Sequence, residues 1–545
     1  MRKLGLVNLI LILALALFMP LAQAQRKSET GAASSAHGNA DYITAAQLKD
    51  YLTFIASDEM EGRDTPSRGL DTTAQYLASQ LSRWGLKPAG DNGTYFQRIG
   101  LGRNKIDAPR TRAEINGQAF NYGEDFLASL AAGSVSGQLV YVGHGWVIKS
   151  KNIDAYQGVD VKDKIVVITG GFLPKGVSFN ELGKQGENFD TPADAARKRG
   201  AKGMIAIPTF DTLTNWENSV RNATTRGSIF VEKFQTQAPT IPAITASPKM
   251  VNALFRGEKV NGTTAFNRAA SNEPGESFEF KPEKTVTITV GVKSEPASTQ
   301  NVVAVLEGSD PALKNEYVAI GAHYDHVGIG TPVNGDAIFN GADDDGSGTS
   351  AVLAMAEAFA RGPRPKRSIL FIWHAGEEKG LWGSKYFTDY PTVPINQIVT
   401  QLNIDMIGRT KKENDKPANQ PLPKPGEIFL IGSKLMSTEL GEVSESVNKS
   451  YLNLSFNYKY DDPKDPEQFF YRSDHFNYAR KGIPIIFYMD GVHEDYHRPS
   501  DTADKIDYQN MEKVSRTIYA TAWELANRPT RPRVDKPLPA EVIGK

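Results

Sequence analysis

Three consecutive aspartates, Asp343, Asp344 and Asp345, lie between glycines in the stretch NGADDDGSG. Adjacent carboxylates repel one another and cannot pack into a protein core as unneutralised charges. One interpretation is a solvated turn, because Asp and Gly are common turn residues. The other is that a bound cation neutralises at least one carboxylate. The choice depends on which other ligand-type side chains the fold brings beside this stretch.

Further residues with metal-binding side chains follow apolar runs of strand length. These are His323 and Asp325 after EYVAIGA, Glu377 and Glu378 after RSILFIWHAG, Asp405 after QIVTQLNI, and His497 in the loop after GIPIIFYMDG. The runs alternate with helical segments, which predicts an α/β fold with a mostly parallel mixed sheet flanked by helices. In such sheets the site lies at the carboxyl ends of the strands. We therefore expect these side chains to meet around a metal.

The available donor types narrow the choice of metal. The chain has no cysteine, so a metal site must use His, Asp and Glu. Two imidazoles with three carboxylates suit zinc, with cobalt or manganese as substitutes. Five protein ligands are too many for one tetrahedral zinc, and they suit two Zn²⁺ ions that share one carboxylate. The glycines around the aspartate triplet would let its backbone bring the shared carboxylate between the ions.

Five stretches resemble, in the same order, the successive motifs of the co-catalytic zinc aminopeptidase family. They are GAHYDHVG, NGADDDGSGTSAV, HAGEEKGLWGS, LNIDMIG and DYHRPSDTADKID. That family also contains glutamate carboxypeptidases, glutaminyl cyclases and the transferrin receptor ectodomain. EMEGRDTPS and WGLKPAG resemble the family's N-terminal part, and YQGVDVKDKIVVITGG and ARKRGAKGMIAI resemble the protease-associated domain often inserted in such enzymes. The resemblance implies the zinc-peptidase fold with an inserted β-rich domain.

The resemblance also implies a role for each matching position. His323 and Asp405 would bind one zinc, Glu378 and His497 the other, Asp344 would bridge them, Glu377 would be the general base, and Asp325 would orient His323. The peptide bond from Asp344 to Asp345 is often cis in the family.

Other residues near these motifs have weaker assignments. Tyr496 and Arg472 resemble positions that stabilise an oxyanion in some members, and the alternatives are packing for Tyr496 and a salt bridge for Arg472. His326, His374 and His493 are expected around the ligands rather than among them, and His475 is expected to be structural.

The implied function is an exported metallo-exopeptidase, an aminopeptidase that uses water activated by two zinc ions. The main alternative is a carboxypeptidase or dipeptidase on the same core, which a basic pocket formed by Arg409 or Arg472 would favour. A glutaminyl cyclase would use a single zinc, and a receptor-like module would have lost ligands. The complete set of five ligands argues against both.

Length, charge and the N-terminal segment set the domain plan. A chain of 545 residues predicts two or three units. The net charge of −1 gives no case for a nucleic-acid partner. A basic start, the apolar run Leu9 to Leu21 and Ala22-Gln23-Ala24 predict a cleaved signal peptide. The chain would then be periplasmic or secreted, free of the membrane, with peptides as its substrates; the sequence predicts no oligomeric state.

The composition of successive segments gives the predicted boundaries. They are 1–24 for the signal peptide, 25–41 for a linker, 42–103 for the N-terminal part of the peptidase domain, 104–281 for the protease-associated insert, 282–527 for the di-zinc peptidase domain and 528–545 for an extended tail.

Overall fold

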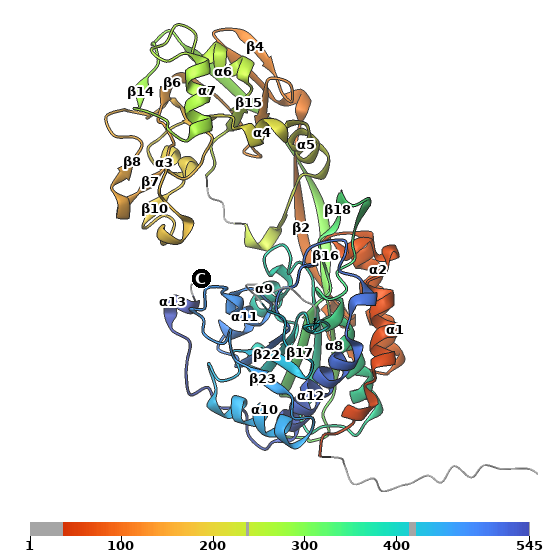
Figure 1. The fold of residues 1–545 in the computed structure, drawn as a ribbon. Helices are drawn as coiled ribbons and strands as arrows, with labels where there is room; N and C mark the ends of the chain where they lie inside the picture. Colours follow the sequence, from red (N-terminus) through yellow and green to blue (C-terminus); the bar gives the residue numbers. More distant parts are fainter. Residues whose placement is uncertain (1–35, 236–238, 414–420, 544–545) are drawn as a thin grey trace, which may run out of the picture.

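The chain folds into two lobes, which Figure 1 shows one above the other. The computed structural model describes residues 36–235, 239–413 and 421–543. The lower lobe contains both ends of the described chain, and the upper lobe is built from the middle of the sequence. The predicted signal peptide lies outside the described residues. Within those residues, no helix is both long and apolar enough to cross a bilayer.

The lower lobe is built on a mixed sheet with the strand order β12-β2-β16-β20-β17-β21-β24-β22-β23, and with β1 beside β16. Its strands are β1 (Lys87–Pro88), β2 (Phe96–Ile106), β12 (Ser228–Val231), β16 (Val292–Leu306), β17 (Tyr317–His323), β20 (Ser368–His374), β21 (Ile398–Ile404), β22 (Glu427–Ile431), β23 (Ser455–Asn457) and β24 (Ile485–Met489). The central pairs β20–β17, β17–β21 and β21–β24 are parallel. Towards the edges, β16 and β22 join this centre antiparallel. The predicted parallel arrangement therefore holds at the centre of the sheet.

Helices cover both faces of this sheet and bury its central strands. One face packs against α1 (Ala45–Ile55), α2 (Arg68–Arg83), α8 (Gly346–Arg361), α10 (Thr438–Ser450) and α12 (Tyr508–Asn527). The other packs against α9 (Trp382–Asp389) and α11 (His475–Ala479). The small side chains of α8 let it lie against the sheet and beneath α1 and α12, so that it is buried from Gly346 to Phe359. Burial on both faces explains why the central strands are continuous apolar runs.

The upper lobe has a second sheet and its own apolar core. The strand order is β4-β3-β15-β6-β9-β11-β13-β5, with β14 beside β6. The strands are β3 (Arg112–Ile115), β4 (Gln118–Asn121), β5 (Phe126–Ala128), β6 (Gly133–Tyr141), β9 (Ile165–Thr169), β11 (Gly203–Ile207), β13 (Ala243–Ala246), β14 (Phe278–Glu279) and β15 (Thr285–Val290). The helices are α3 (Pro192–Lys198), α4 (Phe210–Thr214), α5 (Trp216–Arg221), α6 (Pro248–Leu254) and α7 (Gly262–Ser271). Short strands β7 (Val147–Ile148), β8 (Ile153–Asp154) and β10 (Phe189–Asp190) form a small sheet at its lower side.

One strand lies in a different lobe from the one its predicted boundary implies. The predicted insert ends at residue 281, but β15 pairs with β3 and β6 of the upper sheet. Its alternate residues Val286, Ile288 and Val290 are buried in the core of that lobe. Because β15 leads almost directly into β16, no change in composition marks the crossing between the lobes.

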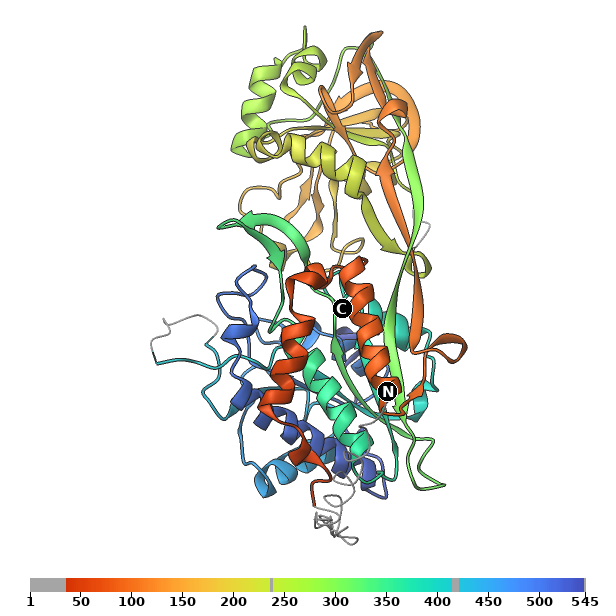
Figure 2. The ribbon, with the colours of Figure 1, turned by 90° about the vertical axis from the view of Figure 1, so that its right-hand side faces the viewer.

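Two long strands connect the lobes. The antiparallel pairing of β2 with β16 continues from Ile106 opposite Val292 to Phe96 opposite Val302, and the pair runs from one lobe into the other in Figures 1 and 2. In the lower lobe a hairpin of β18 (Gly328–Val333) and β19 (Asp336–Phe339) extends beyond the sheet. The segment after α12 runs along the lower lobe to α13 (Ala540–Ile543), with Leu538 buried there.

Candidate metal centre

The ends of the parallel strands bring the predicted ligands to one place. His323 is the last residue of β17, Glu378 follows β20, Asp405 follows β21, and His497 lies in the loop after β24. Asp344 comes from the turn before α8, which itself follows β17 and its hairpin. Carboxyl ends of neighbouring parallel strands lie along a single edge of the sheet. These five side chains, distant in sequence, therefore meet.

Asp344 faces two groups of donor atoms, one with each carboxylate oxygen. Its Oδ1 lies 3.3 Å from Nε2 of His323, and that nitrogen lies 3.5 Å from Oδ1 of Asp405. Its Oδ2 lies 3.1 Å from Nε2 of His497, and that nitrogen lies 3.1 Å from Oε2 of Glu378. Asp344 thus has the position of a carboxylate shared by two sites. Its peptide bond to Asp345 is cis.

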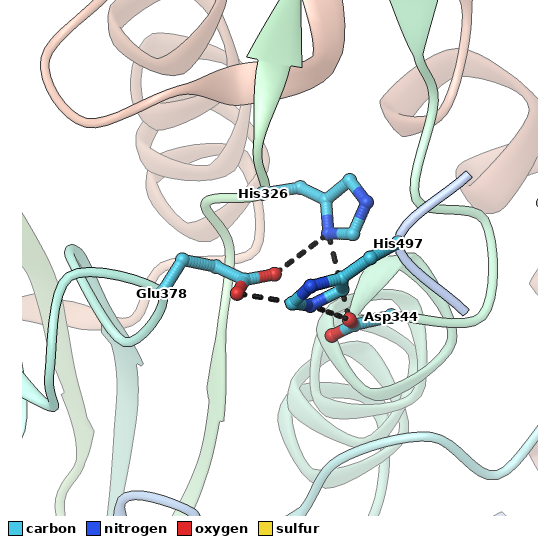
Figure 3. Close-up of side chains that lie close together, drawn as sticks. All are labelled: His326, Asp344, Glu378 and His497. Carbon is cyan, nitrogen blue, oxygen red and sulfur yellow. Dashed lines mark ion pairs between the residues drawn. The ribbon is translucent and has the colours of Figure 1, made fainter. Parts of the chain in front are cut away.

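The second group contains a histidine that was not among the predicted ligands. Nδ1 of His326 lies 2.9 Å from Oε1 of Glu378 and 3.6 Å from Oδ2 of Asp344. Figure 3 shows His326, Asp344, Glu378 and His497 converging from separate segments of the chain. Position alone could not separate a ligand from a neighbour here, because His326 lies in a loop, beyond the end of the strand.

The donor atoms fit a bound cation. Within each group they all lie within 4.8 Å of one another. Four of them are buried without a hydrogen-bond partner among the described residues, namely Oδ2 of Asp344, Oε1 of Glu378, Nδ1 of His326 and Nε2 of His497. Buried polar atoms are almost always satisfied, and a cation shared by these atoms would satisfy them together. Imidazole and carboxylate donors without sulfur are compatible with zinc.

Burial affects the two kinds of carboxylate at this site differently. Burial raises the pKa of Asp344, but the histidines around it outweigh that effect and hold its pKa well below the usual range. Burial also raises the pKa of Glu377, and the neighbouring carboxylates of Glu378 and Asp405 help to hold it well above the usual range. Asp344 therefore remains an anion suited to bind a cation, whereas Glu377 can exchange a proton.

Glu377 belongs to neither group of donor atoms and lines a cleft beside them. Asp344 and Asp405 line the same cleft. The backbone N–H of Glu377 donates a 3.1 Å hydrogen bond to Oδ1 of Asp325. The segment after β20 is therefore tied to the segment after β17.

Asp325 also contacts the ring of His323. Nδ1 of that ring lies 3.1 Å from the backbone oxygen of Asp325 and 3.7 Å from its Oδ1. The other carboxylate oxygen of Asp325 accepts a 3.0 Å hydrogen bond from the Thr65 hydroxyl. The His323 ring is therefore closer to the backbone oxygen of Asp325 than to its carboxylate. The Asp325 carboxylate instead accepts hydrogen bonds from Thr65 and from the backbone of Glu377.

The other two aspartates of the triplet fix the backbone around Asp344. Oδ1 of Asp345 accepts from Gly348 N at the start of α8 and from Met406 N, and its Oδ2 accepts from the backbone N–H of His323. Oδ1 of Asp343 accepts from Gly408 N. Both side chains are buried. They therefore join the turn to the ends of β17 and β21.

Arg63 is a positioning residue that the sequence analysis did not identify. It is fully buried in a 3₁₀ helix, η2 (Asp58–Arg63). Its guanidinium donates to the backbone oxygens of Ile55, Tyr324, Asn340 and Gly341 at 2.6–3.0 Å. Arg63 thus holds together the segments that contain His326 and Asp344. The motif EGRDTPS was the only sequence signal for it.

The three other histidines near the site, His374, His475 and His493, have other partners. Nε2 of His374 lies 3.1 Å from the Tyr478 hydroxyl, Nε2 of His475 lies 2.9 Å from the Phe470 oxygen, and Nε2 of His493 lies 3.1 Å from Oδ2 of Asp343. These partners place them outside both groups of donor atoms.

One of the two candidate arginines faces the cleft and the other does not. Arg409 is buried and donates to Asp495 at 2.8 Å, with Asp501 3.6 Å away. The expectation that Arg409 could help form a basic pocket is therefore wrong, because its charge is already paired. Arg472 is exposed, lies 4.7 Å from the Phe469 ring centroid, and lines the cleft.

Tyr496 and a set of apolar side chains complete the cleft. The Tyr496 ring stacks on His497 with centroids 3.9 Å apart. Burial and nearby carboxylates raise the pKa of Tyr496, so its hydroxyl stays protonated and able to donate. The apolar lining consists of Met406, Phe469, Phe487, Met489 and Val492. Apolar walls next to charged groups are typical of a small-ligand site.

Part of the lower lobe is similar to a known peptidase family. Residues 301–522 match Peptidase family M28. The curated relatives include a protein named Leucine aminopeptidase 2 from Arthroderma otae, 27% identical over 280 residues, which are 46% of this chain and 50% of the relative. Another is Aminopeptidase YwaD from Bacillus subtilis, 23% identical over 344 residues, which are 62% of this chain and 65% of the relative. The chain thus spans between half and two thirds of these relatives.

Among solved structures, the aminopeptidase from Aneurinibacillus sp. strain AM-1 is similar in fold. The alignment covers 92% of this chain and 98% of that one, with a TM-score of 0.51 and 19% identity. This likeness supports the α/β architecture.

Proposed function

We propose that this protein is an exported, zinc-dependent aminopeptidase that removes N-terminal residues from peptides, because residues 301–522 match Peptidase family M28 and the metal-type donors lie within that match. The observation that carries the proposal is Asp344, whose two oxygens face separate groups of histidine and carboxylate donors, with Glu377 beside them. Each group supplies at least three donor residues, which supports the proposal. A receptor-like module with lost ligands would not require such a site, and a glutaminyl cyclase would need only one of the groups.

The catalytic step follows from the position and protonation of Glu377. Zinc bound by the two groups would supply Lewis-acid chemistry and lower the pKa of water. Glu377 takes the proton of the attacking water and delivers it to the leaving nitrogen as the peptide bond breaks. A carboxylate with a raised pKa suits both halves of this exchange. Tyr496, with its protonated hydroxyl, donates a hydrogen bond to the developing oxyanion.

The apolar part of the cleft is the feature that can recognise a substrate's first side chain, because the carboxylates of Asp344 and Asp405 in the same lining are proposed zinc ligands. The side chain of the first residue would lie against the apolar wall that includes Phe469 and Phe487. We therefore propose a preference for large apolar N-terminal residues.

A carboxypeptidase or dipeptidase is the alternative, and Arg472 is the observation that favours it. Arg472 forms no ion pair among the described residues, and its guanidinium lies over the Phe469 ring. An unpaired guanidinium at the cleft could bind the carboxylate of a short peptide. With Arg409 paired elsewhere, Arg472 would have to do so alone.

The test is hydrolysis of a leucine-initiated peptide with its amine free or acetylated. We expect cleavage of the free form only, lost after chelation and restored by zinc. Cleavage of the acetylated form from its other end would replace this proposal with the carboxypeptidase. An Arg472→Gln variant separates the two further, because loss of dipeptide cleavage alone would show carboxylate recognition.

The exported location is a separate proposal that rests on the N-terminal sequence. We expect the mature protein to begin at Gln25, after Ala22-Gln23-Ala24. N-terminal sequencing of protein recovered from outside the producing cell's cytoplasm tests this. An N-terminus at Met1 in that material would contradict it.

A further inference from the structure

His326 occupies a place that the five expected ligands leave unexplained. Its ring is fully buried, and neither ring nitrogen has a hydrogen-bond partner among the described residues. Nδ1 lies 2.9 Å from Oε1 of Glu378, yet the two atoms are not aligned as a hydrogen bond. Nε2 of His497 and Oε2 of Glu378 show a similar short approach of 3.1 Å, and that nitrogen also lacks an aligned partner. Donor atoms that crowd together without bonding to one another are typical of ligands directed at a common point.

The backbone is built to place this ring. The N–H of His326 donates to the backbone oxygen of Arg63 at 3.1 Å. Gly341 packs against the ring with a φ of +57°, and a Cβ there would lie 2.5 Å from Cγ of His326. A side chain at position 341 would therefore displace the imidazole. The glycine that opens the GADDD turn makes the space that His326 fills.

The two groups of donor atoms are unequal. His326, Asp344, Glu378 and His497 form one, while His323, Asp344 and Asp405 form the other. Zinc sites with four protein ligands are closed and tetrahedral, whereas catalytic sites keep a position open for water or substrate. In the larger group the separations of 2.9, 3.1, 3.1 and 3.6 Å are close to those between the corners of a tetrahedron with zinc–ligand bonds of about 2.0–2.1 Å.

We propose that His326 is a metal ligand through Nδ1, and that it closes the position formed with Asp344, Glu378 and His497. The position formed by His323, Asp344 and Asp405 then keeps the open site at which substrate binds. This inference rests on the proposed zinc-peptidase function. One ion would then be held by four side chains, and the other would keep a free position for the reaction.

X-ray absorption of the zinc-loaded wild-type protein tests the ligand count directly, because imidazole rings give a characteristic scattering pattern. We expect three imidazoles shared by two zinc ions. Two imidazoles shared by two zinc ions would overturn the role of His326 while leaving the proposed function intact. Failure of the wild-type protein to bind zinc would overturn both.

A matched pair of variants distinguishes a ligand from a hydrogen-bonding neighbour. His326→Asn keeps a donor near the place of Nδ1 but supplies a poor zinc ligand. After dialysis against a weak chelator, it should retain one zinc, whereas His37→Asn, at a partly exposed histidine that stacks on Tyr451, should retain two. Full zinc content in His326→Asn would show that His326 only positions Glu378. Circular dichroism of both variants confirms that they are folded.

Discussion

At the residue scale, the three consecutive aspartates have three different roles, although they are the same type of residue. Asp345 caps α8 and holds the ends of two strands, Asp343 fixes the backbone at Gly408, and Asp344 faces the donor groups. The carboxylates of the outer two accept hydrogen bonds from backbone N–H groups. The middle carboxylate is left free for a cation.

Glu377 and Glu378 are adjacent, and we predict that changing each to glutamine has a different effect on zinc content. Glu377→Gln should keep its zinc and lose about 10²–10⁴-fold in kcat, because the acid–base group is gone. Glu378→Gln should lose zinc, because its carboxylate belongs to the donor group with His497. Metal analysis and turnover of leucine peptides, measured on the same preparations, give both quantities.

Two results would contradict this assignment. Near-normal turnover in Glu377→Gln would remove it as the general base. Full zinc content in Glu378→Gln would show that its contacts with His326 and His497 do not reflect shared ligation. An exposed glutamate such as Glu295, changed in the same way, controls for the loss of one negative charge.

Strand ends were enough to predict most of the candidate site from sequence. An apolar run followed by His, Asp or Glu identified His323, Glu378 and Asp405, because parallel strands carry their ends to a common edge. His326 and Arg63 are different. Their partners lie in loops distant in sequence, such as Asn340 and Gly341, and no periodicity encodes such contacts.

At the element scale, the N-terminal helices support the site. Arg63 in η2 joins the end of α1, the segment after β17 and the turn before α8 through four backbone oxygens. Burial lowers the pKa of this guanidinium only to about 10, with nearby aspartates opposing the shift. It therefore remains charged near neutral pH and also offsets the negative charge around Asp344.

We predict that Arg63→Lys weakens both stability and zinc binding. A lysine ammonium is a point charge and cannot span the four carbonyls as a planar guanidinium does. The loss of charged hydrogen bonds should lower the free energy of unfolding by about 2 kcal/mol and the zinc affinity by about 10–100-fold. Urea unfolding with EDTA present isolates the first effect, and competition with a zinc chelator measures the second.

The matched control is Arg68→Lys, five residues away at the start of α2. Arg68 is exposed and pairs with Glu61 at the surface, so this change should cost less than about 0.5 kcal/mol. Equal effects of the two substitutions would show that Arg63 acts through general packing rather than by holding the loops.

The fold was predictable where local pattern and tertiary environment agree. The buried parallel strands and the helices between them satisfy that condition. The failures are at positions where the environment changes without a local signal. β15 alternates like any half-buried strand, and only its pairing with β3 and β6 shows which lobe it joins. Likewise, the antiparallel joins of β16 and β22 to the centre of the lower sheet follow from chain topology and carry no local signal.

At the scale of the whole molecule, the two lobes have largely separate cores. The upper core includes Phe120, Leu139 and Ile288, and the lower one includes Ile320 and Phe371. Besides β2 and β16, a small apolar cluster with Leu101, Val231 and Tyr386 lies where the lobes join. Separate cores favour separate cooperative unfolding units.

All proposed zinc ligands lie in the lower lobe, so we predict that zinc stabilises one lobe and not the other. Calorimetry of the whole protein should show two transitions. A ligand at about 100 times its Kd adds about 2.7 kcal/mol to the folded state, which for a lobe of this size corresponds to roughly 4 °C in Tm. Removing zinc with EDTA should lower one transition by that amount and leave the other in place. Asp344→Ala should show the lowered transition even with zinc present, because the shared carboxylate is absent.

A single transition that moves as a whole with zinc would mean instead that β2, β16 and the cluster at Tyr386 couple the lobes into one unit. In that case zinc binding in the lower lobe would also stabilise the upper lobe, through β2 and β16.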